Sequence, residues 1–195
     1  CLALYALLAD KNFFDKKVLR SASKFNSILG GHPEYGKVPG VEASTGALGH
    51  GPAIGVGMAI SAKLNKLNYK TFTIVGDGEI NEGSFWESSM IASKHKLNNF
   101  HIIIDYNKIQ SYGKTKEILD LEPLRFKLES FGYKVSEVNG HNVNHLKKYF
   151  TKIKKNRDKP TALICHTIKG KGFPFAENNP YWHHKNSFTE KEVKE

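Results

Sequence analysis

Two side chains with oxygen donors stand just beyond the ends of two predicted buried strands. Asp77 lies between Gly76 and Gly78 after a β-branched apolar run, and Asn107 follows a second apolar run about 30 residues later. Because a helix would return the chain between two parallel strands, both side chains should reach the same sheet edge, where ligands bind. A carboxylate and an amide carbonyl are hard oxygen ligands. The pattern therefore predicts a site for Mg²⁺, with Ca²⁺ as a possible substitute.

The glycines on either side of Asp77 indicate a second kind of ligand. Gly76 and Gly78 lack a Cβ, so backbone amides can approach a phosphate closely, just ahead of a helix N-terminus that favours anions. Mg²⁺ uses few protein oxygens and completes its shell with phosphate and water. A metal bound together with a diphosphate is therefore the joint interpretation. Taken alone, the Gly-Asp-Gly segment would be more simply interpreted as an ordinary β-turn.

The elements that must position these residues alternate along the chain. Apolar runs predict strands over 70–75, 100–105, 134–138 and 161–166, and helical patterns fall over 2–9, 13–25, 53–67, 82–96, 122–131 and 143–154. The segments 30–51 and 107–120 are expected to be loops. Alternating strands and helices imply an α/β fold with a parallel sheet and helices on both faces. We expect a single domain over 1–195, truncated at its N-terminus because no start methionine precedes the apolar opening run.

Composition narrows the class of protein further. The 195 residues carry 29 Lys and Arg against 19 Asp and Glu, and 39 % are hydrophobic, which excludes disordered and collagen-like chains. The longest apolar run is shorter than the roughly 20 residues that span a bilayer, so no membrane partner is expected. Two distant cysteines without a C-x-x-C pair favour a reducing compartment, and we expect a cytoplasmic protein.

The net charge of +10 leaves a basic nucleic-acid-binding module as an alternative. The lysines are spread along helix-like segments without interleaved aromatic residues, which favours a solvated basic face instead. We therefore expect no nucleic-acid partner.

Several motifs in the same order resemble the transketolase family. They are GHPE at 31–34, TGALGHG at 45–51, GDGE at 76–79, EG at 82–83, DYNKIQ at 105–110, TIKGKG at 167–172 and WH at 182–183. The resemblance covers nearly the whole chain and concerns the diphosphate-binding domain. It implies a thiamine diphosphate-binding fold, thiamine diphosphate and Mg²⁺ as cofactors, and transfer of a two-carbon ketol unit between sugar phosphates.

The resemblance also implies roles for residues around the metal and the diphosphate. Asp77 and Asn107 would bind Mg²⁺ through their side chains, and Ile109 through its backbone carbonyl. Gly78 would meet the diphosphate. Two further residues, Asp105 and Ile168, match positions that line the cofactor pocket of the family.

Three catalytic candidates follow from the same resemblance, each with a plainer alternative. His32 matches a histidine near the hydroxyls of the donor sugar, or it caps a loop. His183, with His184 as the other possible alignment, matches a histidine at the diphosphate and the reacting centre, or the pair is an adventitious metal site or a solvated turn. Glu82 matches a glutamate at the subunit interface, or it is an acidic residue in the first turn of a helix.

Other positions concern the rings of the cofactor and the rest of the enzyme. Gly46 and Leu48 match loop residues against the aminopyrimidine and thiazolium rings, whereas His50 stands where the family usually has Gln. The pyrimidine-binding domain, the C-terminal domain and a loop upstream of Cys1 are absent from this sequence. The pyrimidine-binding domain supplies the glutamate that protonates the aminopyrimidine ring.

We therefore expect a transketolase-like transferase that is inactive without a pyrimidine-domain subunit or the remainder of a longer chain, and that forms an oligomer. The alternatives within the cofactor class are a deoxyxylulose-phosphate synthase and a 2-oxoacid dehydrogenase component.

Overall fold

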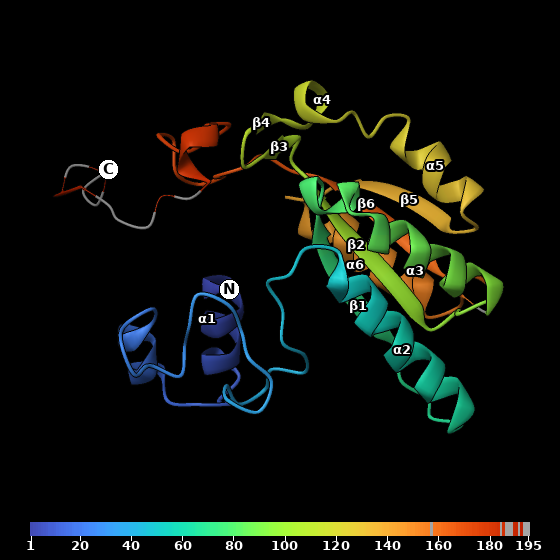
Figure 1. Ribbon diagram of the computed structural model, residues 1–195, viewed down its shortest axis with the longest axis horizontal. Coiled ribbons are helices and arrows are strands. Elements are labelled where there is room, and N and C mark those ends of the chain that lie inside the picture. The colour runs from blue at the N-terminus through green and yellow to red at the C-terminus, as the bar shows by residue number, and fades with distance from the viewer. Residues whose placement is uncertain (157, 184, 186–188, 191, 193–195) are drawn as a thin grey trace. The chain divides into compact units, whose positions relative to one another are not determined.

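The computed structural model describes residues 1–156, 158–183, 185, 189–190 and 192, and the chain divides into two compact units. The first unit is Cys1–His50 and the second is Gly51–Glu195. Figure 1 labels the helices and strands of both.

The first unit holds little regular structure around a small apolar core. Helix α1 (Leu2–Asp10) and the 3₁₀ helix η1 (Lys16–Ser21) are its two helical elements. The fully buried Tyr5 packs with Leu29 and Val38, and its hydroxyl donates a hydrogen bond to the Gly30 carbonyl at 2.9 Å. These contacts fasten the long loop to α1, as ordered loops of this length require.

The predicted helix over 13–25 is wrong, because only η1 forms there. Asn12, Ser23 and Asn26 have φ angles of 63°, 60° and 60°, in the left-handed region that interrupts a right-handed helix. The Ser23 N–H donates to the Leu29 carbonyl, so the chain turns back on itself at this point.

The second unit is built on a four-stranded parallel sheet in the order β1-β2-β6-β5. The strands are β1 (Thr71–Gly76), β2 (Phe100–Tyr106), β5 (Lys134–Asn139) and β6 (Thr161–His166). In register, Gly76 lies opposite Asp105, and Tyr106 lies opposite His166. All four predicted strands are confirmed to within about one residue, and their carboxyl ends share one edge.

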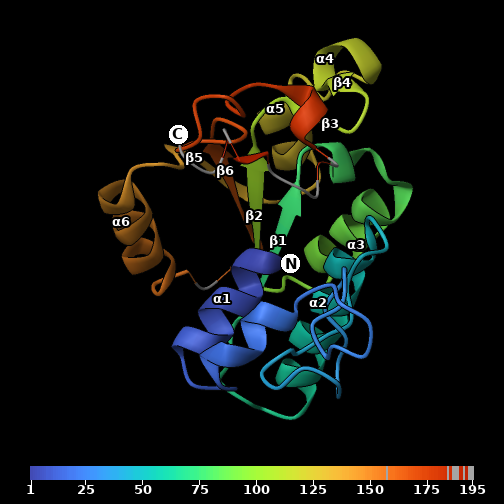
Figure 2. The ribbon, with the colours of Figure 1, turned by 90° about the vertical axis from the view of Figure 1, so that its left-hand side faces the viewer.

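Helices cover both faces of this sheet, which confirms the predicted fold class. Helices α2 (His50–Leu64), α3 (Gly83–Lys94) and α5 (Leu124–Ser130) share a core with the inward side chains of β1 and β2. Helix α6 (Val143–Ile153) packs on the opposite face, against Ile103, Leu163 and Cys165. Figure 2 shows α6 on one side of the sheet and α3 on the other. Helix α2 begins three residues earlier than predicted.

The segment 107–120, predicted as a loop, contains further structure. Strands β3 (Ile109–Gln110) and β4 (Gly113–Lys114) form an antiparallel hairpin, and the short helix α4 (Thr115–Ile118) follows. Two 3₁₀ helices complete the unit, η2 (Gly78–Asn81) and η3 (Pro180–Trp182). Across the described residues, no helix combines the length and apolar character needed to cross a membrane.

Two glycines of α2 provide a matched test of how closely this helix packs on the sheet. A Cβ at Gly55 would overlap Thr73 Oγ1 and lie 2.8 Å from the Phe100 ring, whereas a Cβ at Gly57 would meet nothing within 4 Å. We expect Gly55→Ala to lower the free energy of unfolding by about 1–3 kcal/mol through overpacking. Gly57→Ala should raise it by about 0.5–1 kcal/mol, since alanine is the better helix former. Denaturant unfolding measures both, and equal effects would contradict the packing described.

Candidate functional site

The carboxylate of Asp77 joins the turn after β1 to the turn after β2. Asp77 is only 2 % exposed. Its Oδ1 accepts a hydrogen bond from the Gly78 N–H at 2.8 Å, and its Oδ2 accepts one from the Lys108 N–H at 2.5 Å. Lys108 stands between Asn107 and Ile109. The structure therefore brings Asp77 to the segment that carries the other two predicted metal ligands.

The backbone conformation of the turn after β2 directs the Lys108 N–H toward the Asp77 carboxylate. Lys108 has a φ of 68°, in the left-handed region, and its ammonium lies 5.6 Å from the centre of the Tyr106 ring. The Asn107 Oδ1 accepts a hydrogen bond from the Ile109 N–H at 3.0 Å, which closes an Asx turn. The chain then enters β3, where Ile109 is buried. Local polar contacts thus hold Asn107, Lys108 and Ile109 together at the sheet edge.

The electrostatics of Asp77 fit a site that receives a cation. The pKa of Asp77 is raised to about 6, mainly by burial and to a smaller extent by the nearby Asp105, although hydrogen bonds from the amides of Lys108 and Gly78 act in the opposite direction. A bound cation would favour the charged form. The described residues hold no group of three or more His, Cys, Asp or Glu side chains placed to bind a metal. A metal here would thus depend on Asp77, neutral oxygens and a ligand phosphate, a donor set that suits Mg²⁺.

The two glycines beside Asp77 differ in what surrounds them. A Cβ at Gly78 would lie 2.8 Å from the Gln110 side chain, whereas one at Gly76 would meet nothing within 4 Å. The Gln110 Nε2 is buried and has no partner among the described residues. Because a diphosphate is rich in acceptor oxygens, it would satisfy such a donor. The turn therefore has open space at Gly76 and, in the Gln110 side chain packed against Gly78, a donor for a diphosphate group.

Residues from the ends of the other two strands, β5 and β6, meet at the same edge. The Asp105 carboxylate accepts a hydrogen bond from the Thr167 hydroxyl, which links the ends of β2 and β6. The Ile168 N–H donates to His141 Nε2 at 2.8 Å, which links the turn after β6 to the turn after β5. His141 has no motif around it, and sequence reasoning assigned it no role. His141 could not be identified from a local motif because its contact with Ile168 joins residues that are 27 positions apart.

The C-terminal histidine is also placed near this edge. His183 Nε2 lies 3.1 Å from Ser111 Oγ, at the turn of the β3–β4 hairpin directly after Gln110. The other possible histidine, His184, lies outside the described residues. Glu82 is exposed at the N-cap of α3, where its side chain makes no capping hydrogen bond. The assignment of Glu82 to a subunit interface stays a prediction.

The remaining predicted residues, His32, Gly46 and Leu48, belong to the first unit. Gly46 has a φ of 129°, and a Cβ there would lie 2.6 Å from Cγ of the His32 ring. A backbone hydrogen bond from Thr45 to the Pro33 carbonyl holds the two loop segments together. Leu48 is 58 % exposed. The structure thus pairs His32 with Gly46, and the relation of these residues to Asp77 stays a prediction.

Comparison with known proteins identifies the family. Residues 1–195 match the family described as transketolase, thiamine diphosphate binding domain. The chain therefore belongs to this family, which confirms the resemblance carried by the motifs.

Relatives in the family include both separate subunits and longer enzymes. The chain is 44 % identical over 182 residues to an apulose-4-phosphate transketolase subunit of Phocaeicola vulgatus, covering 93 % of this chain and 64 % of that protein. It is 38 % identical over 175 residues to the 6-deoxy-6-sulfo-D-fructose transketolase subunit SqwG of a Clostridium species, covering 90 % and 64 %. Human transketolase is 35 % identical over 183 residues, covering 93 % and 29 %. The chain therefore spans less than two thirds of the length of these relatives.

Solved structures give the same result for the fold. Transketolase from Campylobacter jejuni superposes with a TM-score of 0.80 at 32 % identity, covering 85 % of this chain and 27 % of that one. The R525L mutant of the Pichia stipitis enzyme gives a TM-score of 0.83 at 28 % identity, covering 91 % and 28 %.

The raised pKa of Asp77 gives a measurable pH dependence. In the metal-free protein, we expect the carboxyl carbon of Asp77 to titrate in an NMR experiment with a midpoint of about 6, against an ordinary value of 3.8. Because folding raises this pKa, the folded state should lose up to about 3 kcal/mol of stability as the pH rises from about 4 through 6. A divalent cation should lower the midpoint. A midpoint near 4 without metal would contradict the burial of this carboxylate.

Proposed function

We propose that this chain supplies the diphosphate-binding half of the active site of a transketolase-type enzyme that uses thiamine diphosphate and Mg²⁺. The observation that carries the proposal is the hydrogen bond from the Lys108 N–H to the Asp77 carboxylate. It joins the Gly-Asp-Gly turn to the Asn107–Ile109 segment, as a shared metal site requires. Membership in the thiamine diphosphate-binding family supports the same cofactor.

The proposed metal site has one charged ligand and two neutral ones. Asp77 and Asn107 would bind Mg²⁺ through side-chain oxygens, and Ile109 through its carbonyl oxygen, with Ca²⁺ as a possible substitute. Asp77 supplies the negative charge, and its burial keeps competing water away. Gly76 leaves room for the diphosphate beside the backbone, and the Gln110 amide, which packs against Gly78, supplies a donor.

Other residues of the chain would orient the cofactor and the sugar. When bound, thiamine diphosphate supplies the carbon nucleophile that is needed to break a carbon–carbon bond of the ketose. Asp105 and Ile168, held by Thr167 and His141, would line its pocket from the ends of β2 and β6. We assign Gly46 and Leu48 to contacts with its rings.

We assign the two candidate catalytic histidines, His32 and His183, to polar contacts with the donor sugar and the cofactor. His32 would hydrogen bond to hydroxyls of the donor sugar. His183, held by Ser111, would reach the diphosphate and the reacting centre. These roles come from the matched motifs.

The reaction we propose is transfer of a two-carbon ketol unit between sugar phosphates. The relatives named as subunits are named for two different sugars, apulose 4-phosphate and 6-deoxy-6-sulfo-D-fructose. We therefore assign the reaction type to this chain and no particular sugar. Similarity to transketolases favours this reaction over those of the other thiamine diphosphate enzymes considered from the sequence.

The active site is proposed to be completed by a pyrimidine-binding domain, on a partner protein or on the remainder of a longer chain. The names of the relatives described as transketolase subunits support a partner for those proteins. We also propose an oligomer with Glu82 at an interface. Helix α3, which begins directly after Glu82, supports this because it exposes Met90 and Ile91 at 54 % and 45 %.

Removal of the Asp77 carboxylate tests the metal site. We expect Asp77→Ala to weaken Mg²⁺-dependent binding of thiamine diphosphate, measured by calorimetry, by about 2 to 4 kcal/mol, or roughly thirty- to a thousandfold. The loss follows because only neutral dipoles would remain to hold the ion. Asn107→Leu should act in the same direction. The two losses should be less than additive because both residues share one ion.

The matched control for this variant is Asp158→Ala. Asp158 is an exposed aspartate between α6 and β6, so its removal changes the net charge equally without touching the proposed site. Affinity should then stay within about twofold of the parent. If Asp77→Ala bound thiamine diphosphate as tightly as the parent, Asp77 would not be a metal ligand and the Gly-Asp-Gly segment would be an ordinary turn.

The need for a pyrimidine domain gives a second functional prediction. We expect no ketol transfer by this chain alone and robust transfer after reconstitution with a partner that carries the pyrimidine domain. The physical reason is that a glutamate must protonate the aminopyrimidine ring of the cofactor. Glu79 and Glu82, the acidic residues beside the Gly-Asp-Gly turn, lie on the diphosphate side of the site and do not fill that role. A coupled assay of aldose consumption measures the reaction. Turnover by the purified chain alone would overturn the proposal that half an active site is present.

A further inference from the structure

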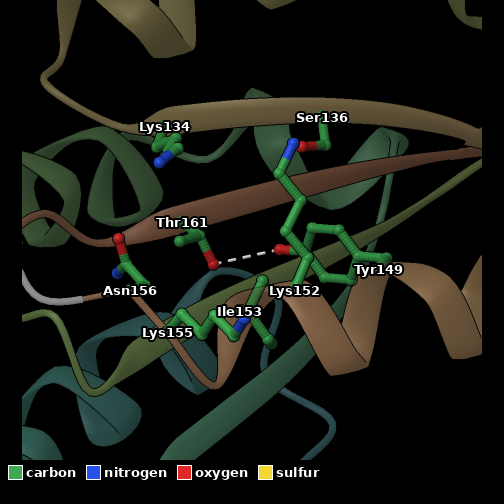
Figure 3. A pocket seen from close by; sticks show the side chains of 8 residues that line it. All are labelled: Lys134, Ser136, Tyr149, Lys152, Ile153, Lys155, Asn156 and Thr161. Carbon is green, nitrogen blue, oxygen red and sulfur yellow. Dashed lines mark hydrogen bonds between the residues drawn. The ribbon is translucent and has the colours of Figure 1, made fainter.

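We propose a second ligand site, for a small hydroxylated phosphate ester, at the amino-terminal ends of β5 and β6. A cavity of about 210 Å³ opens there (Figure 3). Its lining includes three lysines and three hydroxyl groups, from Lys134, Lys152, Lys155, Ser136, Tyr149 and Thr161. Lys134 and Thr161 are the first residues of their strands and pair in register. Because all four strands are parallel, this edge is opposite to the one that carries Asp77, and the site is independent of the function proposed above.

The charge around the cavity favours an anion. Lys134 comes from β5, Lys152 from α6, and Lys155 from the segment that follows α6. No Asp or Glu lines the cavity, and none of these three lysines forms an ion pair with a described residue. Lysines on an ordinary surface are simply solvated. Here they surround a cavity whose floor also carries oriented hydroxyl groups.

A buried chain of hydrogen bonds sets the direction of those hydroxyls. Thr161 Oγ1 lies 2.7 Å from His101 Nδ1 and 3.0 Å from the Tyr149 hydroxyl. Burial, with Lys70 nearby, lowers the pKa of His101 to about 4, so the ring is neutral at pH 7 and carries one N–H. His101 Nε2 is buried without a partner among the described residues.

The position of the His101 proton follows from the cost of an unpaired donor. A proton on Nε2 would leave a buried N–H without an acceptor, an arrangement that is rare in proteins. We therefore place it on Nδ1, where it is donated to Thr161. Thr161 then donates to the Tyr149 oxygen, and the hydrogen of the Tyr149 hydroxyl is available to a ligand. Figure 3 shows the hydroxyls of Tyr149 and Thr161 facing one another among the lining residues.

Asn156 adds an acceptor to the same cavity. It is 8 % exposed and lines the cavity, and its Nδ2 donates to the carbonyls of Asn98 and Lys159. Its Oδ1 has no partner among the described residues. A ligand hydroxyl would satisfy this acceptor, while an anionic group would accept from Tyr149 and the lysines. The cavity is below the roughly 300 Å³ at which pockets for drug-sized ligands begin, so the ester must be small.

Binding of glycerol 3-phosphate to the assembled protein tests this site. We expect saturable binding by calorimetry, equally with and without saturating thiamine diphosphate and Mg²⁺, weaker binding of inorganic phosphate, and none of glycerol. Tyr149→Phe and Lys152→Gln should each weaken binding by about tenfold or more, since each removes a donor to a charged group. The matched control is Lys148→Gln, an exposed lysine of α6 outside the lining, which should bind like the parent.

Several outcomes would overturn the proposal. Loss of binding when thiamine diphosphate is present would place the ester at the diphosphate site. If Lys148→Gln weakened binding as much as Lys152→Gln, binding would depend on the overall positive charge of the surface and not on the cavity. Absence of saturable binding would leave a cavity that is filled by solvent or covered by a partner. Because Lys152 is exposed, its variant keeps the test valid even if Tyr149→Phe lowers the stability of the fold.

Discussion

The buried carboxylate of Asp77 is the contact on which the candidate site depends. Taking this group out of water is unfavourable, and two backbone N–H donors offset only part of the cost, which is why its pKa is raised. One donor comes from its own turn and the other from the turn after β2. The carboxylate therefore holds two strand ends in a single arrangement, and Asn107 and Ile109 are positioned on either side of the second donor.

The parallel sheet gives its two edges different chemical character. At the carboxyl edge, turns after all four strands are linked by polar contacts, among them Thr167 with Asp105 and Ile168 with His141. At the amino edge, lysines and hydroxyl groups line a small cavity, and the buried His101 contacts one of those hydroxyls, that of Thr161. Hydrogen bonding within the strands satisfies the backbone groups in between, so the backbone groups that can contact a ligand lie at the ends of the strands. Each edge can thus hold a ligand without disturbing the apolar core.

The sequence predicted what depends on local patterns and missed what depends on distant contacts. Runs such as 100–105 and 161–166 are apolar and β-branched, so the strands and the turns after them could be placed. The helix predicted over 13–25 does not form: Lys16–Ser21 is a 3₁₀ helix, and Ser23 adopts a left-handed conformation that periodicity does not reveal. The β3–β4 hairpin was missed because its strands are two residues long. The His101–Thr161 contact joins residues 60 positions apart, which no local motif signals.

A crystal structure of the assembled protein with thiamine diphosphate and Mg²⁺ would show whether Asp77 binds the ion. The ion should lie about 2.1 Å from one oxygen each of Asp77, Asn107 and the Ile109 carbonyl, with the diphosphate completing its coordination. The Lys108 N–H should still donate to Asp77. An ion held by the diphosphate and water alone, with the Asp77 carboxylate outside its coordination sphere, would show that Asp77 is not a metal ligand.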